Sequence, residues 1–122
     1  MNDGGRVVVV DDDPTIRRVV RTVLQSAGYQ VDEAVDGTEA LKLVNGGEPP
    51  RVVVLDVMMP GLDGIEVCRR IDTSVTGVLM LTAVDNGPTR HDCEAAGARA
   101  FLTKPFSSIE LLDVVEGMVR GG

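Results

Sequence analysis

Short apolar runs alternate with amphipathic stretches along the whole chain. Three of these runs are rich in β-branched or aliphatic residues and contain no polar interruption, which is typical of strands covered on both faces of a parallel sheet. They lie in Arg6–Val10, Arg51–Asp56 and Gly77–Leu81, and two shorter candidates are Gln30–Ala34 and Ala100–Thr103. The pattern therefore predicts five strands.

The stretches between the strands carry helix signals. Asp13 and Pro14 start the first helix, since Asp caps free N–H groups and Pro lacks only a donor that would be unpaired there. Gly28 ends this helix, and its apolar stripe at 3.6-residue spacing consists of Ile16, Val19, Val20, Val23, Leu24 and Ala27. Further helices are predicted after Asp36-Gly37, from about Ile65 to Ile71, from Pro88 to Gly97, and after a cap at Ser107.

Five strands that alternate with five helices define an α/β fold. Such a chain forms right-handed crossovers and a doubly wound parallel sheet with helices on both faces. Its 122 residues suffice for one domain with one core. We therefore expect a single domain over residues 1–122, with a loose N-terminus at residues 1–5.

Composition narrows the class of protein. The net charge of -7 argues against nucleic-acid binding by this segment, because such binding needs clustered Lys and Arg. There is no apolar run of about 20 residues and no N-terminal signal segment, so we expect a cytoplasmic protein without a membrane span. In that compartment Cys68 and Cys93 are expected to be reduced, buried thiols.

Polar residues follow four of the predicted strands. In open parallel sheets the ligand site lies beyond the carboxyl ends of the strands, where this chain has Asp11 to Asp13, Asp56, Thr82 and Lys104. Carboxylates so close together need a counter-charge. Because all the ligands are oxygen atoms, Mg²⁺ is favoured over zinc. Asp13 is the exception, because its place before Pro14 favours a helix cap.

A carboxylate beside Mg²⁺, with Lys and Thr nearby, is suited to accepting a phosphoryl group. Each residue also has a simpler explanation. The acids could merely cap the following helices, Lys104 could be a surface residue, and Thr82 could be an ordinary end of a strand. Only the convergence of all of them on one edge of the sheet favours the chemical interpretation.

Four segments together resemble the receiver domains of response regulators in bacterial two-component systems. They are VVVVDDDPTIRR, VVVLDVMMPGLDG, LMLTA and FLTKPF, which follow one another in the family's order and spacing between about Val7 and Val119. The resemblance implies a flavodoxin-like (βα)5 fold with strand order 2-1-3-4-5. It also implies that any output domain follows residue 120.

The resemblance assigns roles to the residues at the strand ends. Asp56 is the expected acceptor of a phosphoryl group from a sensor histidine kinase or a phosphotransfer protein. Mg²⁺ is expected to bind Asp12 directly, Asp11 through water, Asp56, and the backbone carbonyl of Met58. Lys104 is expected to pair with the acceptor carboxylate, and its bond to Pro105 is expected to be cis.

The resemblance also implies a switch. Thr82 would turn its hydroxyl onto the phosphoryl group and Phe101 would pack inward, although an apolar ring in a strand is more securely explained as a core residue. The expected output face combines the helix from Pro88, the strand Ala100–Thr103 and the last helix. It would bind an output domain, a partner or, on phosphorylation, a second copy. Arg99-Ala100 replaces an acidic pair of one dimerising subfamily, which argues against that salt-bridged dimer.

Two apolar residues flank the expected acceptor site. Met58 and Val84 stand where the family tunes the hydrolytic water, so we expect slow self-dephosphorylation. The rival hypothesis is a phosphohydrolase with an aspartyl-phosphate intermediate. That enzyme would need an acid two residues after the nucleophile, where this chain has Met58. The sole histidine, His91, is interpreted as a solvated helix residue, and no glycine-rich nucleotide-binding motif occurs.

Overall fold

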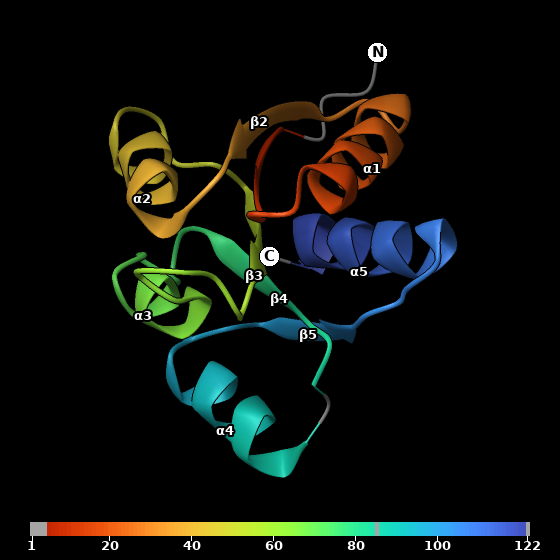
Figure 1. Cartoon of the computed structure of the whole chain (residues 1–122). Helices are drawn as coiled ribbons and strands as arrows, with labels where there is room; N and C mark the ends of the chain where they lie inside the picture. Colours follow the sequence, from red (N-terminus) through yellow and green to blue (C-terminus); the bar gives the residue numbers. More distant parts are fainter. Residues whose placement is uncertain (1–4, 85, 122) are drawn as a thin grey trace.

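The computed structural model describes residues 5–84 and 86–121, in which five strands and five helices alternate (Figure 1). The strands are β1 (Arg6–Val10), β2 (Gln30–Ala34), β3 (Val52–Asp56), β4 (Gly77–Thr82) and β5 (Ala100–Thr103). The helices are α1 (Pro14–Ser26), α2 (Gly37–Asn45), α3 (Gly64–Arg69), α4 (Gly87–Ala95) and α5 (Ser108–Gly121). The expected loose N-terminus at residues 1–5 lies, apart from Gly5, outside the described residues.

The strands form one parallel sheet in the order β2-β1-β3-β4-β5. Helices α1 and α5 cover one face, and α2, α3 and α4 cover the other (Figure 1). The predicted doubly wound α/β fold and its strand order are confirmed. Because β1 and β3 are neighbours in the centre of the sheet, the residues that follow them meet at one edge.

The core consists of two aliphatic layers, one on each face of the sheet. Successive residues of a strand point to opposite faces, so an uninterrupted apolar strand supplies both layers. The layer beneath α2, α3 and α4 includes Val8, Val10, Val53, Leu55, Val78 and Met80. The layer beneath α1 and α5 includes Val7, Val9, Val52, Val54, Leu79 and Leu81. All twelve are essentially inaccessible to solvent, which explains why β1, β3 and β4 tolerate no polar interruption.

Two helix starts follow the predicted capping. The Asp13 carboxylate accepts a hydrogen bond from the backbone of Thr15, and the Ser107 hydroxyl accepts one from the backbone of Glu110. The Glu110 carboxylate accepts a hydrogen bond from the Ser107 N–H, which completes a capping box.

Two other helices begin one residue earlier than predicted. Asp63 caps α3 and Asn86 caps α4, so the helices start at Gly64 and Gly87 rather than at the next residue. Helix α3 also ends at Arg69, two residues before the predicted end. Side-chain caps, and not the apolar stripe alone, therefore set where these helices begin.

Gly64 locks the loop after β3 against the end of that strand. Its N–H donates to the Val57 carbonyl at 3.0 Å. A Cβ at this position would collide with the Asp56 carbonyl oxygen and would stand 2.9 Å from the Val57 Cα. Both neighbours are backbone atoms, so the contact cannot be relieved by rotating a side chain. The backbone of Asp56 is consequently fixed from the α3 side.

We expect Gly64→Ala to lower the free energy of unfolding by more than ~2 kcal/mol, because the added methyl group must displace the backbone at Asp56. Gly87→Ala is the matched control, since Gly87 is also the first residue of a helix and a Cβ there meets no atom within 4 Å. Its effect should stay within about 0.5 kcal/mol. Urea denaturation followed by circular dichroism measures both. Equal effects of the two substitutions would contradict the close packing of Gly64.

Candidate functional site

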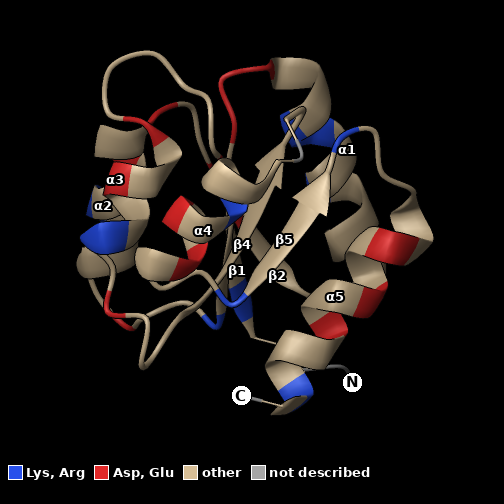
Figure 2. Cartoon of the chain, turned by 90° about the horizontal axis from the view of Figure 1, so that it is seen from below, with Lys and Arg blue, Asp and Glu red and all other residues tan. Residues whose placement is uncertain are grey.

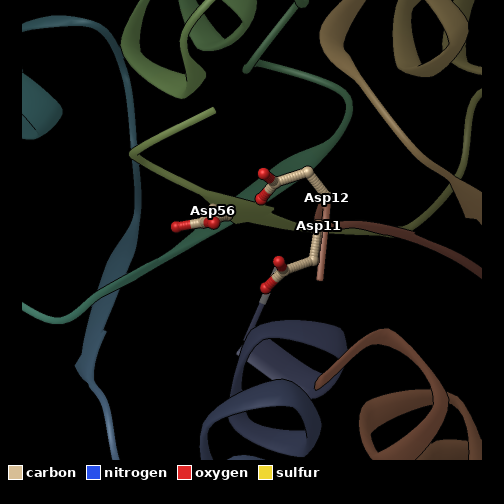
Figure 3. Close-up of side chains that lie close together, drawn as sticks. All are labelled: Asp11, Asp12 and Asp56. Carbon is tan, nitrogen blue, oxygen red and sulfur yellow. The ribbon is translucent and has the colours of Figure 1, made fainter. Parts of the chain in front are cut away.

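Three carboxylates gather at the ends of β1 and β3 (Figure 3). Asp11 and Asp12 directly follow β1, and Asp56 is the last residue of β3. One oxygen of each lies within 4.8 Å of the others. Asp11 and Asp56 are buried, with 1% and 5% of their surface exposed, whereas Asp12 is exposed. The predicted convergence of the three acids is therefore confirmed.

Lys104 brings a positive charge into this cluster from the loop after β5. Its Nζ donates to Asp11 Oδ2 at 3.1 Å and lies 3.5 Å from Asp56 Oδ2. Burial disfavours the ammonium charge, but the hydrogen bond to Asp11 and the charge of Asp56 outweigh it, so the pKa of Lys104 is raised. The expected contact with Asp56 is present, and a shorter one to Asp11 accompanies it.

The backbone around Lys104 directs its side chain toward the acids. The Lys104 N–H donates to the Thr82 carbonyl at 2.7 Å, which extends the pairing of β4 and β5 by one residue. The bond between Lys104 and Pro105 is cis, as expected. The ammonium group thus reaches β3 and β1 from the far side of β4.

The carboxyl group of Asp56 holds its proton unusually tightly. Burial raises its pKa, the charge of Asp11 raises it further, and Lys104 together with the Met58 N–H opposes both, leaving a value of about 6. The Met58 N–H donates to Asp56 Oδ1 at 3.2 Å, while Oδ2 faces Lys104. Asp56 is therefore a desolvated acid whose ionised form is disfavoured by burial and by a neighbouring carboxylate, and a further positive charge nearby would stabilise that form.

Thr82 is the last residue of β4, the strand that neighbours β3 and its terminal Asp56. The residue is fully buried, and its hydroxyl accepts a hydrogen bond from the Val84 N–H at 3.0 Å. The strands β3 and β4 are in register here, with Asp56 opposite Leu81. Met58 and Val84, the two predicted lifetime-tuning residues, are 67% and 43% exposed. We refer to these two exposed apolar side chains, which follow Asp56 and Thr82 by two residues each, as the apolar rim.

Phe101 lies on β5, outside the acid cluster. It is partly buried and packs against the core layer beneath α2, α3 and α4. The guanidinium of Arg90 from α4 stands 4.4 Å from the centre of the ring. The interpretation of Phe101 as a core residue fits this position, and its role as a switch remains a prediction.

A second contact of the acid cluster was not predicted. Arg17, in the first turns of α1, donates from its guanidinium to the backbone carbonyl of Asp11 at 2.8 Å. A cation near a helix N-terminus is unfavourable toward the helix dipole, so its presence there was a signal that Arg17 has a specific partner.

The remaining residues singled out in the sequence lie apart from the acids. Cys68 and Cys93 are free and buried, and burial raises the pKa of the Cys68 thiol to about 11. His91 is exposed on α4. Within residues 5–84 and 86–121, no helix combines the length and the apolar character needed to cross a membrane.

The raised pKa of Asp56 predicts a pH-dependent penalty on folding in the absence of metal. The folded protein binds the proton of Asp56 more tightly than the unfolded chain does. Protonation of Asp56 therefore contributes fully to the free energy of unfolding below about pH 4, and this contribution is lost as the pH rises through about 6. Asp56→Asn should therefore raise the free energy of unfolding by ~2 kcal/mol near pH 7.5 and by clearly less near pH 4.5.

Urea denaturation in EDTA at the two pH values measures this difference. Asp113→Asn, at an exposed acid of α5, is the control and should show no comparable dependence on pH. A gain for Asp56→Asn that is equal at both pH values would contradict the account.

Comparison with known proteins identifies the family. Residues 7–116 match the response regulator receiver domain. The response regulator MprA of Mycobacterium sp. (strain KMS) is 44% identical over 117 residues, which cover 94% of this chain and 50% of that protein. The chain thus spans about half the length of the curated relatives that it matches.

Two solved structures have the same fold at recognisable sequence identity. The chemotaxis protein CheY4 of Vibrio cholerae superposes with a TM-score of 0.87 at 34% identity, over 93% of this chain and 97% of that one. The receiver domain of the Francisella response regulator 1452 gives the same TM-score and identity, over 96% and 98% of the two chains. With its fold, its three acids and its lysine in place, the chain belongs to the response regulator receiver domains.

Proposed function

We propose that Asp56 accepts a phosphoryl group from a sensor histidine kinase or a phosphotransfer protein. The observation that carries the proposal is the position of its carboxylate, which is buried between the like charge of Asp11 and the ammonium of Lys104. One oxygen faces Lys104, so the ammonium group would stabilise the negative charge of a phosphoryl group bound to this oxygen. The domain is a phosphoacceptor in two-component signalling and not an enzyme that turns over a substrate.

The donor set of the acid cluster fits Mg²⁺. Asp11, Asp12 and Asp56 offer only oxygen atoms, all within 4.8 Å of one another, and the charge of Lys104 alone leaves three carboxylates under-neutralised. Asp12 and Asp56 would bind the ion directly, Asp11 through water, and the Met58 carbonyl would complete the protein ligands. When bound, the ion supplies charge that neutralises the phosphoryl oxygens.

The transfer is a displacement at phosphorus. An Asp56 carboxylate oxygen forms the new O–P bond as the N–P bond to the donor histidine breaks, and the imidazole leaves with the electron pair of that bond and takes up a proton. Lys104 moves from pairing with the carboxylate to pairing with a phosphoryl oxygen. The hydroxyl of Thr82, now bonded to the Val84 N–H, would turn to donate to another phosphoryl oxygen.

The new charge on Asp56 would be read on the face formed by α4, β5 and α5. Movement of Thr82 would let Phe101 pack inward and repack this face, which a C-terminal output domain, a partner or a second copy of the chain would bind.

We propose that the protein works in the cytoplasm. Lys and Arg occur at separate places among the Asp and Glu residues (Figure 2) and the net charge is -7, which supports the absence of direct nucleic-acid binding.

The rival function, an aspartyl-phosphate phosphohydrolase, would need a general acid two residues after the nucleophile. Met58, two residues after Asp56, has a thioether side chain that cannot protonate a leaving group. A turnover assay with simple phosphate esters separates the two functions. Many turnovers for each protein molecule would favour the hydrolase, and a single stable label favours the receiver.

We expect Asp56→Asn to abolish labelling by a small phosphodonor such as acetyl phosphate in the presence of Mg²⁺, because the amide oxygen is a poor nucleophile. Intact-protein mass spectrometry detects the added phosphoryl group. Asp72→Asn, at an exposed acid in the loop after α3, is the control and should label like the wild type. Labelling of Asp56→Asn at the wild-type level would refute the assignment of the acceptor.

The apolar rim predicts a long-lived phosphorylated form. Met58→Asn combined with Val84→Glu should shorten its lifetime by about tenfold or more, because the new side chains can hold and orient a hydrolytic water. Loss of the label is followed by mass spectrometry after removal of the phosphodonor. Val75→Asn, at an exposed apolar residue before β4, should leave the lifetime unchanged. An unaltered lifetime in the double variant would refute the role of the rim.

A further inference from the structure

We propose that Arg17 is a positioning residue for the metal-binding acids, an inference that rests on the proposed function of the site. Arg17 does not contact the carboxylates that would hold the ion. It donates instead to the backbone carbonyl of Asp11 at 2.8 Å, and thereby sets the direction in which the chain continues to Asp12.

Each polar group of Asp11, in the backbone and in the side chain, takes part in a hydrogen bond. Its N–H donates to the Ala34 carbonyl of β2 at 3.3 Å, and its Oδ1 accepts from the Asp13 N–H at 2.9 Å. Its Oδ2 accepts from Lys104, which leaves the backbone carbonyl as the remaining group. Arg17 is the residue that fixes this carbonyl.

The contact matters because of the peptide plane. The Asp11 carbonyl belongs to the peptide unit that ends at the Cα of Asp12, and this unit is rigid and planar. Holding the oxygen therefore fixes the point from which the Asp12 side chain leaves the backbone. Asp12 needs such help, since it is exposed and its carboxylate forms no hydrogen bond or ion pair with any residue in 5–84 and 86–121.

Arg17 is itself held rigidly by β2. Its Nε donates to Glu33 Oε1 at 3.0 Å, and only 16% of its side chain is exposed. Glu33 precedes Ala34, the residue that accepts from the Asp11 N–H. Both backbone groups of Asp11 are thus anchored to the same short segment of β2, one directly and one through Arg17.

The charge of Arg17 would by itself repel a metal cation, but its ion pair with Glu33 offsets part of this charge. Glu33 also pairs with Arg21, one turn further along α1, through its second oxygen. Arg21 lies on the same helix as Arg17 and pairs with the same acid. Among the described residues, it forms no hydrogen bond with the Asp11 loop, by which we mean residues 11–13 between β1 and α1. It is therefore a matched control in which the same charge is removed without the contact to Asp11.

The test measures Mg²⁺ binding to the 122-residue chain and its variants by titration, followed by amide NMR shifts of Asp11, Asp12 and Asp13. Arg17→Met should raise the dissociation constant for Mg²⁺ by roughly tenfold, because residues that orient metal ligands have effects of this size. It should also shift these amides before metal is added. Arg21→Met should leave the dissociation constant within about twofold of the wild type.

Urea denaturation of the same proteins separates positioning from stability, since both substitutions remove an ion pair with Glu33. Weaker Mg²⁺ binding in Arg17→Met alone supports the inference. Unchanged binding in Arg17→Met, or an equal loss in Arg21→Met, overturns it while leaving the proposed function intact. Absence of Mg²⁺ binding by the wild-type chain overturns the proposed metal site itself.

Discussion

The repulsion between carboxylates at one edge of the sheet is the constraint on which the site depends. Asp11 and Asp56 are both buried, and burial together with the charge of Asp11 raises the pKa of Asp56. Lys104 lies against both of them and offsets part of this cost. The remaining imbalance makes the cluster receptive to a cation and, once the cation is bound, to the phosphoryl group that it helps to neutralise.

The fold is what makes this concentration of charge possible. A parallel sheet with helices on both faces lets β1 and β3 lie side by side, although α1, β2 and α2 separate them along the chain. The aliphatic strands supply the burial that raises the pKa of Asp56. Gly64 on one side and the Asp11 loop on the other then fix the backbone from which the acids extend.

Much of this arrangement could be predicted from local patterns. Uninterrupted Val and Leu runs indicate strands buried on both faces, and polar residues at their carboxyl ends indicate a site, because both follow from the geometry of parallel sheets. The shorter contact of Lys104 with Asp11 could not be predicted, since it depends on distances between strands far apart in the sequence. The same holds for Gly64, whose small size is required by the backbone of Asp56.

Arg17 shows why such contacts escape periodicity. Arg17 lies outside the apolar stripe of α1, and its proposed function depends on a backbone carbonyl that no side-chain pattern reveals. The helix ends are a second example. One polar side chain, Asp63 or Asn86, moved a helix start by one residue, and the competition between a cap and the first apolar position is decided by geometry.

Locating the phosphoryl group on the chain tests directly whether Asp56 is the acceptor. Treatment with acetyl phosphate, reduction of the acyl phosphate with borohydride and peptide mapping by mass spectrometry identify the modified residue. We predict modification of Asp56 that requires Mg²⁺ and disappears in EDTA. Modification at Asp11, Asp12 or His91 in place of Asp56, or labelling of Asp56 that is indifferent to Mg²⁺, would contradict it.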